Sequence, residues 1–210
     1  LKAATKMFYY NRCNAPKELA YAGADWVDGM NFAGPLQDAN CRYIHDPNNA
    51  ALEKNLTGGW FDAGDYNKYV TYTHNTLHAL LSAYEENPTV YKDNWNIPES
   101  GNGIPDLLDE IKWELDWLYK MSNADGTAHI KMGSSSYVVN TSAPPSNNDG
   151  QRFYGPLCST ASATIASVFA HAAKVFETQP GMAAYATTLE TRAIACWNHL
   201  KAKMDTDDLD

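Results

Sequence analysis

Two carboxylates set in a glycine-rich stretch are the side chains of this chain best suited to catalysis. Asp62 and Asp65 lie three residues apart within Gly58–Tyr69, which contains three glycines. Glycine permits backbone conformations that other residues avoid, so a tight, non-helical path is expected. Two acceptors on such a loop can hold one water, and a carboxylate can take a proton from it. Alternatively, both side chains only cap turns and a nearby helix.

Aromatic residues stand beside these carboxylates. Trp60, Phe61 and Tyr66 are among the nearest, and the whole chain has 6 Trp and 13 Tyr. Aromatic rings stack on the apolar faces of pyranose rings. Clustered in a cleft, Trp60, Phe61 and Tyr66 would bind a carbohydrate substrate, whereas scattered aromatic residues would serve packing.

Composition argues against several classes of partner. The 210 residues are 44% hydrophobic and 20% charged, which is typical of a globular protein, and the net charge is −9. No cluster of Lys and Arg is present, so neither nucleic acid nor an anionic membrane is expected as a partner. The apolar runs are too short to span a bilayer. No signal peptide is visible, so we expect any targeting segment to have been removed or to lie upstream.

Hydrophobic periodicity predicts at least four helices. Their apolar stripes cover residues 77–84, 105–121, 159–176 and 182–204. Weaker patterns predict a helix or strand in 1–12, a short helix at Lys17–Ala24, and short strands at 128–132 and 137–139. Long irregular segments, 14–57 and 123–156, separate these elements. The chain is therefore predicted to be all-α, with function in its loops.

Three acids crowd the first turns of the helix that Pro105 opens, namely Asp106, Asp109 and Glu110. The helix dipole favours negative charge at this end of a helix. They are therefore expected to cap the helix and face solvent, without a chemical role.

Four cysteines, Cys13, Cys41, Cys158 and Cys196, lie far apart in a chain long enough to fold without disulfides. An antiparallel pair of the last two predicted helices would bring Cys158 and Cys196 toward each other. Cys13 and Cys41 would then form the other pair. Buried free thiols are the alternative.

Four stretches of the sequence carry a family resemblance. Gly58–Val70 closely resembles the motif of the family 9 glycoside hydrolases, which are cellulase-type enzymes. Ile97–Glu110, continuing to Trp117, resembles the second helix region of that family. Phe8–Cys13 resembles the start of the catalytic module in a subgroup with an upstream immunoglobulin-like domain. Ser159–Ala163 is similar to a later helix start of the family.

This resemblance implies a fold and an activity. The fold is an (α/α)6 barrel of inner and outer helices, whose long loops form an active-site cleft at one end. The activity is hydrolysis of β-1,4-glucosidic bonds in cellulose or a related β-glucan, with inversion, by a secreted enzyme. The motif identifies Asp65 as the general base that activates water, and Asp62 as the residue that helps to hold that water. No cofactor is required for this chemistry.

The resemblance also implies that part of the catalytic machinery lies elsewhere. The general acid of the family is a glutamate late in a considerably longer module, and the glutamates of this chain all come too early in the order of motifs. Residues 1–210 are therefore predicted to be the N-terminal half of one catalytic domain. The remainder of the module would supply the acid. Half of a closed helical barrel would expose a large apolar face.

Metal sites of the family are only weakly indicated. The subgroup often carries a zinc site of two Cys and two His, with the second Cys followed directly by His. Cys13 fits the first position, but Cys41 is followed by Arg42, and the nearest histidine is His45. Because this spacing is loose, a Cys13–Cys41 disulfide or free thiols are favoured over zinc. Structural calcium is implied as well, without assignable ligands.

Three functions compete. The first is an endo-acting or exo-acting hydrolase of cellulose or a related β-1,4-glucan, with exo-action on glucosamine oligomers as a variant. The second is a catalytically inactive carbohydrate-binding relative, but a module that only binds has no need of a water-holding pair such as Asp62 and Asp65. The third is a structural all-α domain without a sugar role, which the specific motifs disfavour.

Overall fold

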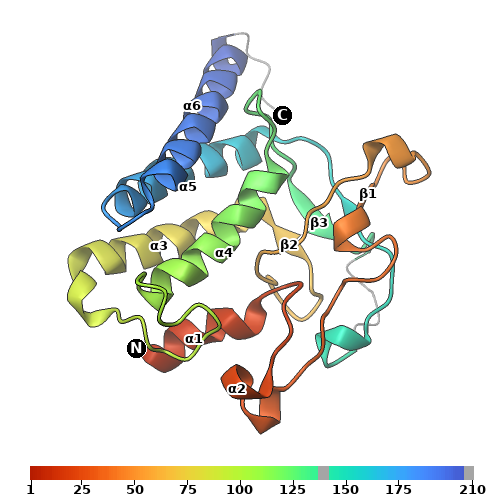
Figure 1. Cartoon of the computed structure of the whole chain (residues 1–210). Helices are drawn as coiled ribbons and strands as arrows, with labels where there is room; N and C mark the ends of the chain where they lie inside the picture. The colour runs from red at the N-terminus through yellow and green to blue at the C-terminus, as the bar shows by residue number, and fades with distance from the viewer. Residues whose placement is uncertain (137–141, 206–210) are drawn as a thin grey trace.

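A computed structural model describes residues 1–136 and 142–205, and most of its regular structure is helical (Figure 1). The helices are α1 (Lys2–Asn11), α2 (Leu19–Ala22), α3 (Thr73–Glu86), α4 (Asp106–Met121), α5 (Ser159–Glu177) and α6 (Ala183–Asp205). The strands are β1 (Arg42–Tyr43), β2 (Lys68–Tyr69), β3 (Lys131–Gly133) and β4 (Phe153–Tyr154). The four helices predicted from periodicity are thus confirmed as α3 to α6. Among the described residues, no helix combines the length and apolar character needed to cross a membrane.

Helix α4 carries the apolar stripe on which much of the core is built. Leu108, Ile111, Leu115 and Leu118 recur at helical spacing and are all fully buried. Helix α3 packs against both α4 and α5, and α5 and α6 form a hairpin (Figure 1). Buried alanines on α5 and α6 allow these two helices to approach each other closely.

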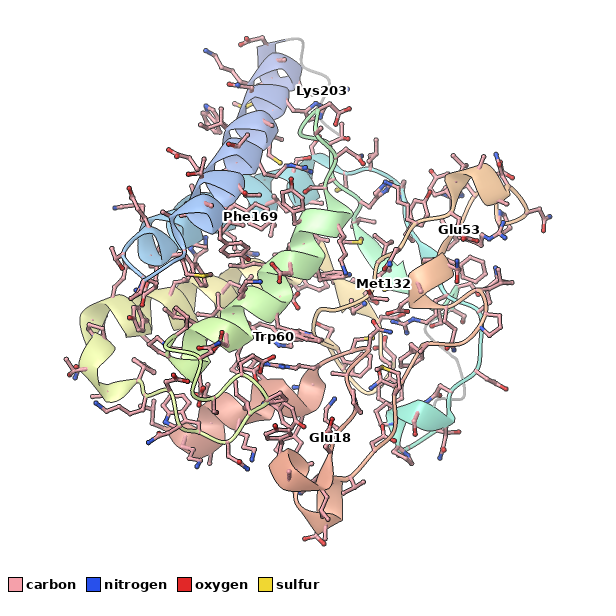
Figure 2. All side chains as sticks on the ribbon, viewed as in Figure 1. Glu18, Glu53, Trp60, Met132, Phe169 and Lys203 are labelled. Atoms are coloured by element: carbon pink, nitrogen blue, oxygen red, sulfur yellow. The ribbon has the colours of Figure 1, made fainter. Side chains whose placement is uncertain are left out.

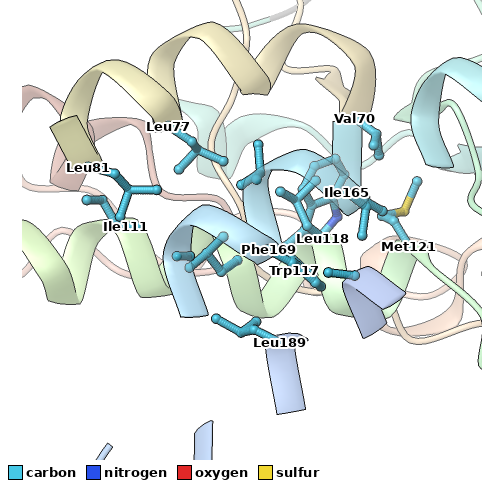
Figure 3. Close-up of a cluster of buried hydrophobic side chains, with 14 of the residues drawn as sticks. Val70, Leu77, Leu81, Ile111, Trp117, Leu118, Met121, Ile165, Phe169 and Leu189 are labelled. Atoms are coloured by element: carbon cyan, nitrogen blue, oxygen red, sulfur yellow. The ribbon is translucent and has the colours of Figure 1, made fainter. Parts of the chain in front are cut away.

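Trp117 joins this core to the glycine-rich stretch. Its fully buried side chain belongs to the same cluster as Ile165 and Phe169 of α5 (Figure 3). A Cβ atom on Gly59 would lie 2.7 Å from Cγ of Trp117, and the φ angle of Gly59 is +76°. Only glycine fits this close approach, which fixes the path of the backbone toward Asp62.

A small sheet connects the long irregular segments, so the prediction of an all-α chain is incomplete. The strand order is β1-β4-β3-β2, with β1 parallel to β4 and the other pairs antiparallel. Strands β1, β2 and β4 have only two residues each, too few for periodicity to reveal. The strand predicted at 128–132 corresponds to β3, and the one predicted at 137–139 lies outside the described residues. Residues 1–12 form α1, and the helix predicted at Lys17–Ala24 shortens to α2.

All four cysteines are free thiols, so the predicted disulfides are wrong and the alternative holds. The hairpin of α5 and α6 turns at about residue 180, which leaves Cys158 roughly 9 Å along the helix axis from the level of Cys196. That separation exceeds the reach of a disulfide. Cys13 instead donates to Oδ2 of Asp38 at 3.1 Å, and burial raises the pKa of this thiol to about 12.

The acids at the start of α4 are buried, which corrects the prediction that they face solvent. Asp106 and Glu110 are 0% exposed and Asp109 is 8% exposed. Glu110 accepts from Nε of Arg12 at 3.0 Å, and Asp109 accepts from the side chain of Asn102. Helix position alone could not reveal this burial, because the partners come from distant segments.

An apolar groove of about 690 Å³ runs between α5 and α6. Alanine is the most frequent residue in its lining, which also contains Ile194 and Trp197, 53% and 59% exposed. Trp197 differs in this from Leu189 and Leu200 of the same helix, whose side chains are buried. Exposed apolar surface of this kind is typical of a face that packs against further protein.

Glu114, in the middle of α4, is a fully buried acid. Its Oε2 accepts from the backbone N–H of Trp60 at 2.6 Å, and its Oε1 has no partner among the described residues. Burial raises the pKa of Glu114 from 4.5 to about 8. A raised pKa means that the folded state binds the proton more tightly. The stability that Glu114 contributes is therefore complete below about pH 4.5 and is lost as the pH rises toward 8.

We expect Glu114→Gln to remove most of this pH dependence. The amide oxygen still accepts from Trp60, but the side chain cannot ionise. In the parent, the free energy of unfolding should fall between about pH 5 and pH 8. In the variant, this fall should be smaller by at least about 1 kcal/mol. Urea unfolding across this range measures the difference, and Glu86→Gln, at an exposed position of α3, is the control. Parallel curves for parent and Glu114→Gln would contradict this account.

Candidate functional site

The stretch Gly58–Tyr69 follows a tight, non-helical path, as predicted, and ends in strand β2. Its first part pairs with the end of α1, where the N–H of Phe61 donates to the carbonyl of Asn11 at 2.9 Å. Tyr66 then adopts a φ angle of +56°, which is uncommon outside glycine. This turn lies between Asp65 and β2 and sets the direction in which the chain leaves the loop.

The two predicted catalytic carboxylates differ in their surroundings. Asp65 is half-buried, and its Oδ1 and Oδ2 accept from the backbone N and the Nδ2 of Asn67 at 3.1 and 2.6 Å. Asp62 is exposed, and its backbone N–H donates to the carbonyl of Asn67 at 2.9 Å. Partial burial and the negative charge of Asp65 raise the pKa of Asp62 above its usual value. The two carboxylates are therefore close enough for the charge of Asp65 to act on Asp62.

Each carboxylate lines its own hollow. Asp62 lines a hollow of about 210 Å³ together with Trp60 and Phe61. Asp65 lines a second hollow of about 300 Å³ together with Tyr66. The structure thus brings each predicted catalytic residue together with predicted aromatic residues.

The aromatic rings pack against one another. Trp60 and Phe61 are both 8% exposed. Trp60 lies between α1 and α4, with its ring centroid 4.7 Å from that of Phe8 (Figure 2). The ring of Phe61 lies 5.0 Å from Tyr66 and 5.5 Å from Phe32. The cluster supports the loop, and sugar binding by its members stays a prediction.

A fully buried ion cluster anchors both ends of the loop. Asp38 accepts from Nζ of Lys68 at 2.8 Å and from Nε of Arg152 at 2.7 Å. Lys68 also donates to the carbonyl of Gly58 at 2.6 Å, and Arg152 donates to that of Tyr66 at 2.8 Å. Sequence reasoning missed this cluster, because Asp38 lies 30 residues from Lys68 and 114 residues from Arg152. Lys68, a charged residue inside the stretch Gly58–Tyr69, is the only local feature of the sequence that indicates this cluster.

A second buried charge network connects α1 to α4. The guanidinium of Arg12 is almost fully buried and donates to Glu110 at 3.0 Å and to both oxygens of Glu99 at 2.8 and 3.0 Å. It also lies 4.5 Å from the ring centroid of Trp113. The backbones of Arg12 and Trp60 form an isolated antiparallel β-bridge. This network therefore holds the start of the loop against α4.

Three carboxylates converge at the start of α4. One oxygen from each of Asp93, Asp106 and Asp109 lies within 4.8 Å of the other two. Asp106 is fully buried, and within the described ranges its Oδ1 has no hydrogen-bond partner. Burial, followed by the neighbouring carboxylates, raises the pKa of Asp109 to about 7. Hard oxygen donors of this kind fit Ca²⁺, which would neutralise their repulsion and give Oδ1 a partner.

The residues of the weak zinc pattern do not come together in the structure. Cys13, Cys41 and His45 form no group with metal-ligand spacing in the part of the chain that the structure describes. Both cysteines are buried, and the Cys13 thiol is already bonded to Asp38.

Glu114 is the one glutamate among the described residues that line these two hollows. Its raised pKa keeps it protonated at neutral pH, which a general acid requires. However, it is 0% exposed and accepts a hydrogen bond from the backbone of Trp60. It therefore cannot reach a glycosidic oxygen, and its role is structural.

Comparison with known proteins relates this geometry to one family. A sequence model described as Glycosyl hydrolase family 9 matches residues 1–209. Endoglucanase D of Acetivibrio thermocellus is 34% identical over 180 residues, which cover 83% of this chain and 27% of that protein. The xyloglucan-specific endo-beta-1,4-glucanase BoGH9A of Bacteroides ovatus is 32% identical over 205 residues, covering 92% of this chain and 33% of that protein.

Solved structures give the same result. A Bacteroides ovatus GH9 structure matches with a TM-score of 0.84 and 26% identity, over 96% of this chain and 37% of the other. A metagenome-derived glycoside hydrolase family 9 endoglucanase matches with a TM-score of 0.79 and 32% identity, over 96% and 35%. The chain thus spans about a third of the length of these relatives. It belongs to glycosyl hydrolase family 9.

Proposed function

We propose that this chain is the N-terminal part of a catalytic module that hydrolyses β-1,4-glucosidic bonds with inversion. The observation that carries the proposal is the pair of interacting carboxylates, Asp62 and Asp65, on a rigidly anchored loop. Membership of the family and relatives named as endoglucanases support the same reaction.

In the proposed reaction, Asp65 acts as the general base. Each carboxylate oxygen has two acceptor positions, and Asn67 occupies one on each oxygen of Asp65. The others remain available to a water. Asp62 accepts a second hydrogen bond from this water and orients it. The water oxygen attacks the anomeric carbon, its proton passes to Asp65, and the bond to the leaving oxygen breaks.

The leaving oxygen takes its proton from a general acid that we assign to a part of the module outside this chain. Glu114 is buried and bonded to the backbone, which argues against it as the donor. We also propose that Trp60, Phe61 and Tyr66 contact the glucan, because they line the hollows beside the two carboxylates.

We also propose that this chain folds as part of an (α/α)6 barrel, and the exposed groove between α5 and α6 supports this proposal. In an (α/α)6 barrel, further helices of the module would cover Ile194 and Trp197, which a chain of this length leaves exposed. Residues 1–210 would then form the N-terminal portion of one barrel domain. The motif Phe8–Cys13 supports an immunoglobulin-like domain upstream, and the cellulase-type relatives support secretion.

We further propose that Asp93, Asp106 and Asp109 hold a structural Ca²⁺, separate from the proposed chemistry. Asp93 accepts from the backbone N–H groups of Gly101 and Gly103, which orients its carboxylate. The cation would connect the polar segment before α4 to the first turn of that helix.

Added Ca²⁺ is expected to raise the melting temperature of the protein by several degrees, since a ligand at about 100 times its Kd stabilises by about 2.7 kcal/mol. Asp109→Asn should abolish most of this response. In chelator-treated protein the same variant should melt at or above the parent temperature, because it removes one repelling charge. Asp46→Asn, at an exposed position, is the matched control. An unchanged Ca²⁺ response in Asp109→Asn would refute the site.

For catalysis, Asp65→Ala in the full-length protein should lower kcat on carboxymethyl-cellulose or cello-oligosaccharides by about 10²- to 10⁴-fold, the usual contribution of a general base. Oligosaccharide binding, measured by calorimetry, should persist. Asp25→Ala, at an exposed position of the loop 14–57, should leave both unchanged. Full activity in Asp65→Ala would refute the assignment of Asp65 as the general base. Binding without hydrolysis in the parent protein would favour the inactive carbohydrate-binding alternative.

A further inference from the structure

We propose that Asn67 is a positioning residue for the reaction described above: it fixes the carboxylate of Asp65 and links it to the backbone of Asp62. This inference rests on the proposed function of Asp65. Asn67 is 0% exposed, so it does not touch substrate and acts only through its neighbours.

Asn67 holds Asp65 at two points. Its backbone N–H donates to Oδ1 at 3.1 Å, and its side-chain Nδ2 donates to Oδ2 at 2.6 Å. One donor would leave the carboxylate free to rotate about its Cβ–Cγ bond, whereas two donors on different oxygens fix its plane. The carbonyl of Asn67 also accepts from the N–H of Asp62 at 2.9 Å. One residue therefore sets the positions of both proposed catalytic residues.

The orientation of the Asn67 amide is fixed by a third segment. The backbone N–H of Ser134 donates to Oδ1 of Asn67 at 2.8 Å. A backbone N–H can only donate, so the atom facing Ser134 must be the amide oxygen. The NH₂ group of Asn67 is thereby directed at Asp65. Because Asn67 is fully buried, an amide turned the other way would leave polar groups without partners.

Glycine at position 133 makes room for this arrangement. In the antiparallel register, Lys68 faces Met132, so Gly133 stands opposite Asn67. A Cβ atom on Gly133 would lie 1.8 Å from Oδ1 of Asn67 and 2.7 Å from its Cγ. A side chain there would displace the amide, and with it the donor to Asp65.

One consequence follows for the reaction. The fixed plane of the Asp65 carboxylate presents the same two acceptor positions to water in every turnover. Loss of the Nδ2 donor should therefore reduce kcat.

Asn67→Asp is the decisive variant, because it keeps the shape and the acceptor for Ser134 but replaces the donor to Asp65 by an acceptor. We expect Asn67→Asp and Asn67→Ala in the full-length protein to lower kcat on cello-oligosaccharides by about 10- to 100-fold. KM should change much less. Thermal unfolding establishes that each variant is folded.

Gly133→Ala provides an independent test. It should reproduce the lowered kcat of Asn67→Ala, and the double variant should have little less activity than Asn67→Ala alone. Gly29→Ala is the matched control, since a Cβ atom on Gly29 would come no closer than 3.7 Å to its nearest neighbour, the side chain of Ser146.

The inference fails if Asn67→Ala and Asn67→Asp keep the parent kcat while Asp65→Ala is inactive. It also fails if the folded variants lose activity only through a raised KM. Full activity in Asp65→Ala would overturn the proposed function and this inference together.

Discussion

The buried pairing of Asp38 with Lys68 and Arg152 is the interaction on which the rest of the site depends. Burial alone would raise the pKa of Asp38, but Arg152 and Lys68 outweigh it and hold that pKa below its ordinary value. Removing one partner of such a cluster leaves an unpaired buried charge, which typically costs about 3–5 kcal/mol. The cluster joins the loop 14–57, strand β2 and the segment before β4. Three regions distant in sequence are thereby held around one carboxylate.

This anchoring explains how the loop can be rigid enough for the proposed catalysis. Lys68 adjoins Asn67, and Arg152 holds the carbonyl of Tyr66, so the residues after Asp65 are held from both sides. At the other end, Gly59 lies against the ring of Trp117 and cannot move inward. The helical core thus fixes the start of the loop, and the ion cluster and the small sheet fix its end. Rigid support of this kind is what positioning a water requires.

The parts of this architecture that follow from local patterns were predictable from the sequence. Helical periodicity predicted α3 to α6, and the glycines of Gly58–Tyr69 predicted its tight, non-helical path. The pairings of Asp38 and of Arg12 were not predictable, because they join residues far apart in the chain. The burial of Asp106 and Glu110 was missed for the same reason: their partners lie outside α4. The two-residue strands were invisible because alternation needs more residues to show.

The stereochemistry of hydrolysis tests the central claim most directly. If Asp65 activates a water on the face opposite the leaving oxygen, cleavage of a β-1,4 bond must first release the α-anomer. Proton NMR of the anomeric region during the first minutes of hydrolysis of a cello-oligosaccharide by the full-length protein resolves the two anomers before they interconvert. The account predicts that the α-anomer appears first and the β-anomer grows in later. Initial release of the β-anomer would contradict it, because that result requires a covalent intermediate on a carboxylate nucleophile.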